Sequence, residues 1–225
     1  MRKKVIFILL LIAILASTVS FGFSNEYIIF YQPLNYSFTS DVQGDKKIYN
    51  MIEKDGINNI YIEIVPNTTN NNSLDISEDD VDDFTNNMKE QIEEGYNTNT
   101  AILQSKISTV GNKFYRCIIY EHKLENYDIY QKMYVIFSDN YIYGITLTSN
   151  NKEYFTNKEI EMFLNSIEIK DTITEHKDIS NLSKTKNNKI NKIESFIICG
   201  IIVMIIYAIV GIFQKNKIIN KDNNK

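Results

Sequence analysis

Crowded carboxylates are the first feature of the sequence that could carry chemistry. Six of them fall within residues 75–83, and the candidate metal ligands among them are Asp75, Asp79, Asp80 and Asp83. Carboxylate oxygens are hard ligands that suit calcium, but the Asp-x-Asp-x-Asp-Gly spacing of a calcium loop is missing. The helix dipole also favours carboxylates in the first turn of a helix. A solvated helix start is therefore the favoured interpretation, and a metal site is the alternative.

Residues suited to acid–base or nucleophilic catalysis are few. The sequence contains no phosphate-binding loop, no Gly-rich dinucleotide fingerprint, no Cys-x-x-Cys pair and no His-Glu-x-x-His motif. Its two histidines, His122 and His176, are both predicted to be solvated surface residues. Cys117 lies in an apolar run and is predicted to be a small buried side chain. The sequence therefore predicts no enzymatic activity and no cofactor.

Tyrosine is abundant, with fifteen in the chain. The candidate partner-binding residues among them are Tyr115, Tyr130, Tyr134 and Tyr143, all in predicted strands. Tyrosine suits a binding surface because its ring buries area while its hydroxyl stays hydrated. Cross-strand aromatic pairs are also an ordinary way to stabilise a sheet, and this second interpretation is favoured.

Charge is distributed unevenly along the chain. Residues 25–175 hold 25 acidic and 12 basic side chains, a balance of −13, whereas the remaining residues hold 3 acidic and 12 basic. An acidic domain repels phosphate backbones, so nucleic acid is excluded as its partner. The basic ends suit anionic lipid surfaces instead.

A secretory signal is predicted at the start of the chain. An apolar run from Val5 to Ala16 follows three basic residues and precedes a stretch of small ones, which is typical of a signal peptide over residues 1–24. Cleavage after Ser20, Gly22 or Ser24 fits the pattern. Because no cysteine lies near these positions, a lipid-modified cysteine is excluded as the membrane anchor.

A transmembrane helix is predicted near the C-terminus. The segment between Phe196 and Phe213 has eighteen residues without a charge and would form a helix of about 27 Å, close to the thickness of a bilayer core. We expect a polar stalk over residues 173–194, a span over 195–214 and a short basic tail over 215–225. With a cleaved signal the protein is a single-pass cell-membrane protein, with an extracytoplasmic domain over residues 25–172 and a cytoplasmic C-terminus. An uncleaved N-terminal anchor would also leave the domain outside.

Strands in the domain are predicted from alternation of apolar residues. Ile60, Ile62 and Ile64 give the first strand. Weaker extended segments at residues 27–31, 36–40 and 47–52 are predicted to be edge strands. Four further strands follow at residues 101–110, 113–121, 127–137 and 141–148. Tight turns at Gly111-Asn112 and Ser138-Asp139-Asn140 predict antiparallel hairpins.

Two helices interrupt these strands. The first begins at Ser77 and ends before Gly95, and its apolar stripe is Val81, Phe84, Met88 and Ile92. The second begins with a capping box from Thr156 to Glu159 and presents Ile160, Phe163, Leu164 and Ile167. A short closing strand is expected at residues 168–170. The order of elements predicts an α+β domain in which helices pack on an antiparallel sheet.

This order resembles the PsbP-like α/β/α sandwich. The residues that carry the resemblance are the Tyr143-Gly144-Ile145-Thr146 strand and the C-terminal helix ending in Phe163-Leu164-Asn165-Ser166-Ile167, and it covers roughly residues 27–170. The resemblance implies a binding or accessory module rather than an enzyme, and it transfers no site residues.

The sequence thus favours a non-catalytic, membrane-anchored module that binds a protein or cell-envelope partner outside the membrane. Two alternatives stay open at this point: a carrier domain for a small ligand or cation, and a metal-dependent hydrolase that uses the acidic cluster.

Overall fold

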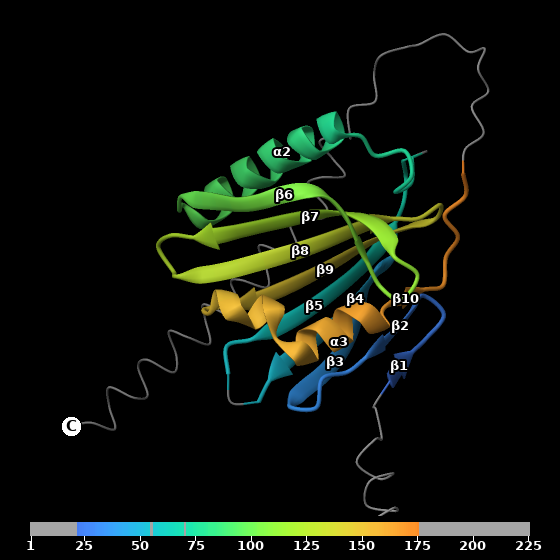
Figure 1. Ribbon diagram of the computed structural model, residues 1–225, viewed down its shortest axis with the longest axis horizontal. Helices are drawn as coiled ribbons and strands as arrows, with labels where there is room; N and C mark the ends of the chain where they lie inside the picture. Colours follow the sequence, from blue (N-terminus) through green and yellow to red (C-terminus); the bar gives the residue numbers. More distant parts are fainter. Residues whose placement is uncertain (1–21, 55, 70, 176–225) are drawn as a thin grey trace, which may run out of the picture.

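The computed structural model describes residues 22–54, 56–69 and 71–175 (Figure 1). Its main element is a seven-stranded sheet in the order β3-β4-β5-β9-β8-β7-β6, and every neighbouring pair is antiparallel. The strands are β3 Tyr36–Gln43, β4 Lys46–Glu53, β5 Asn59–Pro66, β6 Thr100–Val110, β7 Tyr115–Leu124, β8 Ile129–Phe137 and β9 Tyr141–Ser149.

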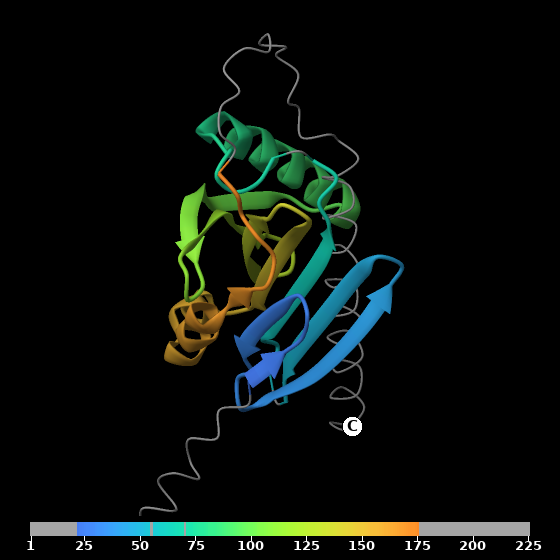
Figure 2. The ribbon, with the colours of Figure 1, turned by 90° about the vertical axis from the view of Figure 1, so that its right-hand side faces the viewer.

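Helices lie on both faces of this sheet. Helix α2, Glu78–Tyr96, covers one face, and α3, Lys158–Ser166, lies against the other together with the 3-10 helix η1, Lys152–Thr156 (Figure 2). A second sheet of three short strands packs beside α3, in the order β1 Gly22–Ser24, β2 Ile28–Tyr31 and β10 Glu168–Ile169. The predicted α+β architecture and its order of elements are confirmed.

Two apolar cores fill the space between these layers. Ile60, Ile62 and Ile64 of β5 point into the core under α3 and the small sheet, where Phe163 and Phe30 meet in an edge-to-face contact. The stripe predicted for the first helix, Val81, Phe84, Met88 and Ile92, fills the second core under α2. Because both faces of the sheet are covered there, its central strands bury side chains on both sides.

One of the two helices starts at its predicted cap, and the other starts one residue later. Ser77 caps α2 as expected, because Asp80 N donates to Ser77 Oγ and Ser77 N donates to Asp80 Oδ2, which completes a capping box. The predicted cap at Thr156 is wrong: Asn157 caps α3 by accepting from Glu159 N. Thr156 instead ends η1, where its hydroxyl donates to Glu153 O.

Two of the three predicted edge strands are not edges of the main sheet. Residues 47–52 lie in β4, which pairs with β3 and β5. Residues 28–31 form β2, which pairs with β1 on one side and β10 on the other. Strand β1 also falls within the segment assigned to the signal peptide, and Phe23 of β1 packs against Phe30 and Phe38. Cleavage after Ser20 would keep this strand whole.

The last described residues are held by two carboxylates, Asp139 and Asp171, which we call the C-terminal clasp. Asp139 accepts hydrogen bonds from the hydroxyls of Thr172 and Thr174. Asp171 accepts from N and Nδ2 of Asn140 at 2.8 Å each. The domain therefore continues through Thr174, two residues into the predicted stalk.

None of the helices within the described residues is long and apolar enough to cross a membrane. The predicted span between Phe196 and Phe213, most of the predicted signal peptide and the rest of the stalk lie outside the described residues.

Candidate functional site

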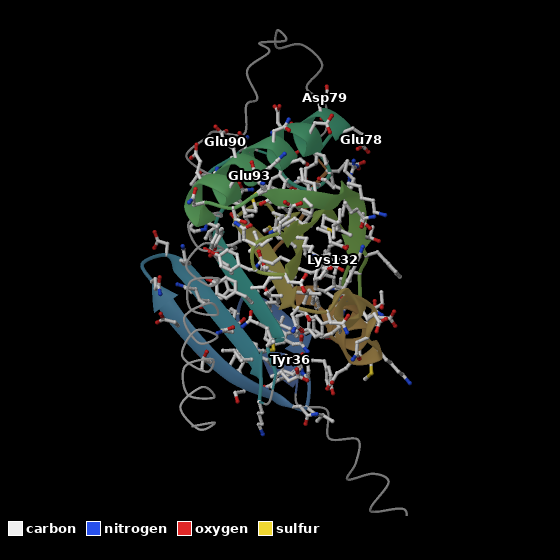
Figure 3. All side chains as sticks on the ribbon, turned by 90° about the vertical axis from the view of Figure 1, so that its left-hand side faces the viewer. Tyr36, Glu78, Asp79, Glu90, Glu93 and Lys132 are labelled. Atoms are coloured by element: carbon white, nitrogen blue, oxygen red, sulfur yellow. The ribbon has the colours of Figure 1, made fainter. Side chains whose placement is uncertain are left out.

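The acidic cluster supports the start of α2. Asp80 belongs to the capping box, and Asp75 Oδ2 accepts a hydrogen bond from Asn72 N. Asp79 and Asp83 are exposed, and Glu78 and Asp79 lie at the beginning of the helix (Figure 3). Across the described part of the chain, no group of three or more His, Cys, Asp or Glu side chains could hold a metal ion. The structure thus does not assemble these residues into a metal centre.

The four candidate tyrosines divide into two pairs. Tyr134 and Tyr143 are 6% and 0% exposed, so their assignment to a partner-binding surface is wrong. Burial raises the pKa of both hydroxyls. Tyr115 and Tyr130 are half-buried, and the ring of Tyr130 lies under the ammonium of Lys123 at 5.1 Å. Both rings pack against the core under α3, but their register partners are Val110 for Tyr115 and Lys123 and Ser149 for Tyr130, so neither forms a cross-strand aromatic pair in the main sheet.

His122 is buried, so its prediction as a surface residue is wrong. It is 1% exposed and lies beside Tyr120, with ring centroids 5.1 Å apart. Burial lowers the pKa of its imidazole to about 3, against a small opposite effect of Gln131. The ring is therefore neutral at physiological pH and cannot serve as a cationic ligand or as an accessible base. His176 lies outside the described residues.

A row of buried polar side chains crosses the sheet at His122. In register across β7, β8, β9 and β5 lie His122, Gln131, Thr148 and Asn59, each about 1% exposed. Gln131 Nε2 donates to Thr148 Oγ1 at 3.1 Å. Both His122 nitrogens, Gln131 Oε1 and Asn59 Oδ1 lack a hydrogen-bond partner among the described residues. The row is a polar seam inside the sheet layers, and all four of its side chains are enclosed.

A buried ion pair lies further along the same face of the sheet. Glu63 of β5 has only 7% of its side chain exposed, and Lys46 Nζ approaches Glu63 Oε1 at 3.1 Å. Burial raises the pKa of this carboxyl to about 8 although Lys46 acts to lower it. Such a shift can mark an acid–base catalyst, but here the group is enclosed, and its described charged partner is a cross-strand neighbour.

An open, polar pocket lies at the C-terminal end of α2, and we call it the α2 pocket. Its volume is about 330 Å³, and it is lined by Glu93, Asn97, Thr98, Asn99 and Asn126. Glu93 and Asn97 come from the end of α2, Thr98 and Asn99 from the link to β6, and Asn126 from the β7–β8 turn. The two walls are joined because Glu125 N donates to Asn99 O at 3.3 Å.

An exposed aromatic side chain stands at the opposite end of β6. Residues Gly111, Asn112, Lys113 and Phe114 form the β6–β7 tip, and Phe114 is 76% exposed with a φ of 54°. Gly111 has a φ of 85°, and a Cβ there would lie 2.6 Å from Ile167 O. The tip is therefore packed closely against the end of α3.

Sequence comparison finds no family model and no curated protein that matches the chain. Among solved structures, the chain is similar to the solution structure of cyanobacterial PsbP (CyanoP) from Synechocystis sp. PCC 6803, with a TM-score of 0.51 and 10% identity over 66% of this chain and 91% of that one. The domain has a PsbP-like fold. A crystal structure from Bacteroides thetaiotaomicron VPI-5482 also matches, with a TM-score of 0.39, 11% identity and coverage of 66% of this chain but 47% of that one.

Sequence reasoning missed both exposed features. The sequence prediction places Phe114 in a strand, although the turn residues Gly111-Asn112, separated from it only by Lys113, are a signal that it belongs to the turn. The α2 pocket joins residues 93–99 to Asn126. The Asn-Thr-Asn-Thr run at residues 97–100 signalled a polar turn, but nothing local indicated that Asn126 would lie beside it.

Proposed function

We propose that the protein is a non-catalytic, single-pass membrane protein whose extracytoplasmic domain binds a protein partner at the outer surface of the membrane. The observation that carries the proposal is Phe114, a large aromatic side chain left 76% exposed on a strained backbone. The transmembrane helix between Phe196 and Phe213 is part of the proposal, and it rests on the sequence pattern.

The backbone conformation at Phe114 is energetically unfavourable, and the described contacts of the residue give no structural reason for it. A left-handed conformation costs a bulky residue about 1–2 kcal/mol, and Asn or Gly would avoid it. Strained residues persist where their surroundings fix them, and they gather at binding and active sites. An exposed phenylalanine gives little stability in return, so a binding role is the better explanation of its presence.

The β6–β7 tip is held in one arrangement. Asn112 N donates to Ile167 O at 2.9 Å, and Asn112 Nδ2 donates to Glu168 Oε2 at 3.0 Å. Lys113 Nζ also binds the other oxygen of Glu168 at 2.9 Å. These contacts fix the backbone that carries Phe114, so a partner that binds the ring need not order this segment first.

The tip lies at the end of the domain where the chain leaves for the stalk. The β6–β7 hairpin and the C-terminal clasp are at the same side of the sheet in Figure 1, and the start of α2 lies there too. Arg116 Nη2 donates to Ile76 O at 2.7 Å, which ties the hairpin to the residue before the α2 cap. If the stalk leads to the membrane, the β6–β7 tip, which carries Phe114, lies on the membrane side of the domain.

Site-specific photocrosslinking in intact cells tests this proposal. A crosslinking amino acid placed at position 114 should capture a defined protein, whereas the same group at Val42, which is 62% exposed at the end of β3, should not. Protease shaving of the same cells should cleave the domain from outside. Identical patterns from positions 114 and 42, or protection of the domain from protease, would contradict the proposal.

A substitution at the same position separates binding from folding. Phe114→Asn relieves about 1–2 kcal/mol of backbone strain and removes the roughly 50 Å² of ring that is buried, worth about 1.2 kcal/mol. These terms offset one another, so the variant should keep its stability and lose the partner. Loss of both together would mean that Phe114 is a structural residue.

A further inference from the structure

We infer that the α2 pocket is a second binding site, one that takes a small polar ligand through a primary ammonium group. The inference is independent of the proposed role of Phe114, because the two features lie at opposite ends of β6.

The electrostatics of the end of α2 favour a cation. Helix carbonyls carry partial negative charge at a C-terminus, and proteins usually place Lys, Arg or His there. Helix α2 has no basic residue in its last turn and carries Glu90, Glu93 and Glu94 near its end instead (Figure 3 labels Glu90 and Glu93). Lys89 Nζ is 3.9 Å from Glu93 Oε1, and an exposed pair at that distance compensates little of this charge.

Glu93 is positioned to receive a ligand. Its Oε1 accepts a hydrogen bond from Thr100 N at 2.9 Å, which fixes the carboxylate at the base of β6. Its second oxygen, Oε2, has no hydrogen-bond partner among the residues the structure describes. Directly behind the lining, Thr100 is 5% exposed and its hydroxyl also lacks a partner there.

The rest of the lining supplies hydrogen-bond acceptors of the right kind. The side-chain amides of Asn97, Asn99 and Asn126 form no hydrogen bond within the described ranges, and each offers a carbonyl oxygen. An ammonium group donates three hydrogen bonds, so one carboxylate and two or three amide oxygens match it. Amide nitrogens can in addition donate to hydroxyls of the same ligand.

The geometry limits the class of ligand. About 330 Å³ is at the lower end of small-molecule sites, so the pocket suits a compact amine or amino sugar rather than a long chain. Fewer than three acidic or imidazole groups line it, so a divalent metal would lack the charged ligands that it prefers.

Calorimetric titration of the full chain in detergent micelles tests the inference with three probes: glucosamine, N-acetylglucosamine and ethylammonium. Glucosamine should bind, and N-acetylglucosamine, which lacks the charge, should bind at least about tenfold more weakly, a difference of about 1.4 kcal/mol. Ethylammonium distinguishes the two sources of the ammonium group: weaker binding than glucosamine indicates an amino sugar, and equal binding indicates a simple amine. Equal binding of both sugars, or no binding of glucosamine and ethylammonium, would overturn the inference.

Two matched variants locate the site. Glu93→Gln keeps an acceptor for Thr100 N and should weaken glucosamine binding at least about tenfold without changing the melting temperature. Glu90→Gln removes the same charge one turn earlier on α2, outside the pocket lining, and should change binding less than about twofold. Equal weakening by both substitutions would show diffuse attraction to an acidic helix rather than a site.

Discussion

His122 and Glu63 should give the stability of the domain two opposing pH dependences. The pKa of His122 is lowered by burial from 6.5 to about 3, so between these two pH values the imidazole is protonated in the unfolded state and neutral in the folded state. Stability contributed by neutral His122 is present above pH 6.5 and is lost as the pH falls towards 3. The pKa of Glu63 is raised from 4.5 to about 8, so its contribution grows as the pH falls from 8 to 4.5.

The two contributions are similar in size over an accessible range. Between about pH 7 and about pH 5, linkage gives a loss of about 2 kcal/mol from His122 and a gain of about 2.5 kcal/mol from Glu63. In the unmodified protein the two changes in the free energy of unfolding therefore nearly cancel. Substituting one of the two residues leaves the change caused by the other. His122→Asn should make the protein gain about 2 kcal/mol on acidification relative to the unmodified chain. Glu63→Gln should have the opposite effect.

Urea unfolding of the full chain in detergent micelles, followed by the near-ultraviolet circular dichroism of its tyrosines, measures these differences. Any pH-independent cost of a substitution cancels when the same variant is compared at two pH values. His176→Asn, in the predicted stalk, is the matched control and should follow the unmodified chain. If the difference between His122→Asn and the unmodified chain changes by less than about 0.5 kcal/mol, His122 is not enclosed in the folded state and the reasoning fails.

Three further predictions follow from single contacts. Asp139→Ala removes the acceptor for the hydroxyls of Thr172 and Thr174, so cleavage within residues 171–175 should become faster in limited proteolysis followed by mass spectrometry. An unchanged cleavage rate would mean that the clasp does not hold this segment. Burial raises the pKa of the Cys117 thiol to about 12. In a Cys199→Ser background, a maleimide should therefore label the chain only when the domain unfolds. Rapid labelling of the folded protein would disprove the burial. Because Gly22–Ser24 form β1, N-terminal sequencing of the mature protein should begin at Phe21, and a start at Asn25 would remove a strand on which this fold depends.

Local patterns predicted most of the elements, because each pattern reports burial directly. Ile60, Ile62 and Ile64 lie in one core as their alternation required, and the Ser77 cap with its apolar stripe gave α2 almost to its end. Cys117 is buried, as its apolar surroundings predicted.

The prediction for His122 failed because residue type was given more weight than periodicity. Tyr120, His122 and Leu124 alternate along β7 and therefore point to the same face of the sheet. Tyr120 and Leu124 are fully buried, so the strand period predicts that His122 is buried as well. Tyr134 and Tyr143 failed for a different reason. A sheet covered on both faces offers no exposed side to its central strands, and the sequence does not state how many layers cover it.

Contacts between distant segments had no local signal. Strand β10 pairs Ile169 with Ile28, and the α2 pocket unites the end of α2 with Asn126. Such pairings depend on how the layers close, and neither periodicity nor capping residues report that closure.

The α2 pocket and the β6–β7 tip lie at opposite ends of the domain, so we expect it to bind a ligand at one end and a protein at the other. Helix α2 has 19 residues and is about 28 Å long, so the α2 pocket lies about that far from the capped start of the helix. The β6–β7 tip, beside the end of α3, and the C-terminal clasp both lie towards the end of the sheet near which α2 starts, on the right in Figure 1. If the stalk continues from the clasp to a membrane, the β6–β7 tip lies on the membrane side of the domain and the α2 pocket lies at its far end. The pocket and the β6–β7 tip share no residue and lie at opposite ends of β6, so a ligand in the pocket need not compete with a partner held at Phe114. Saturating glucosamine should therefore leave photocrosslinking at position 114 unchanged, and loss of the crosslink would show that the two ends are coupled.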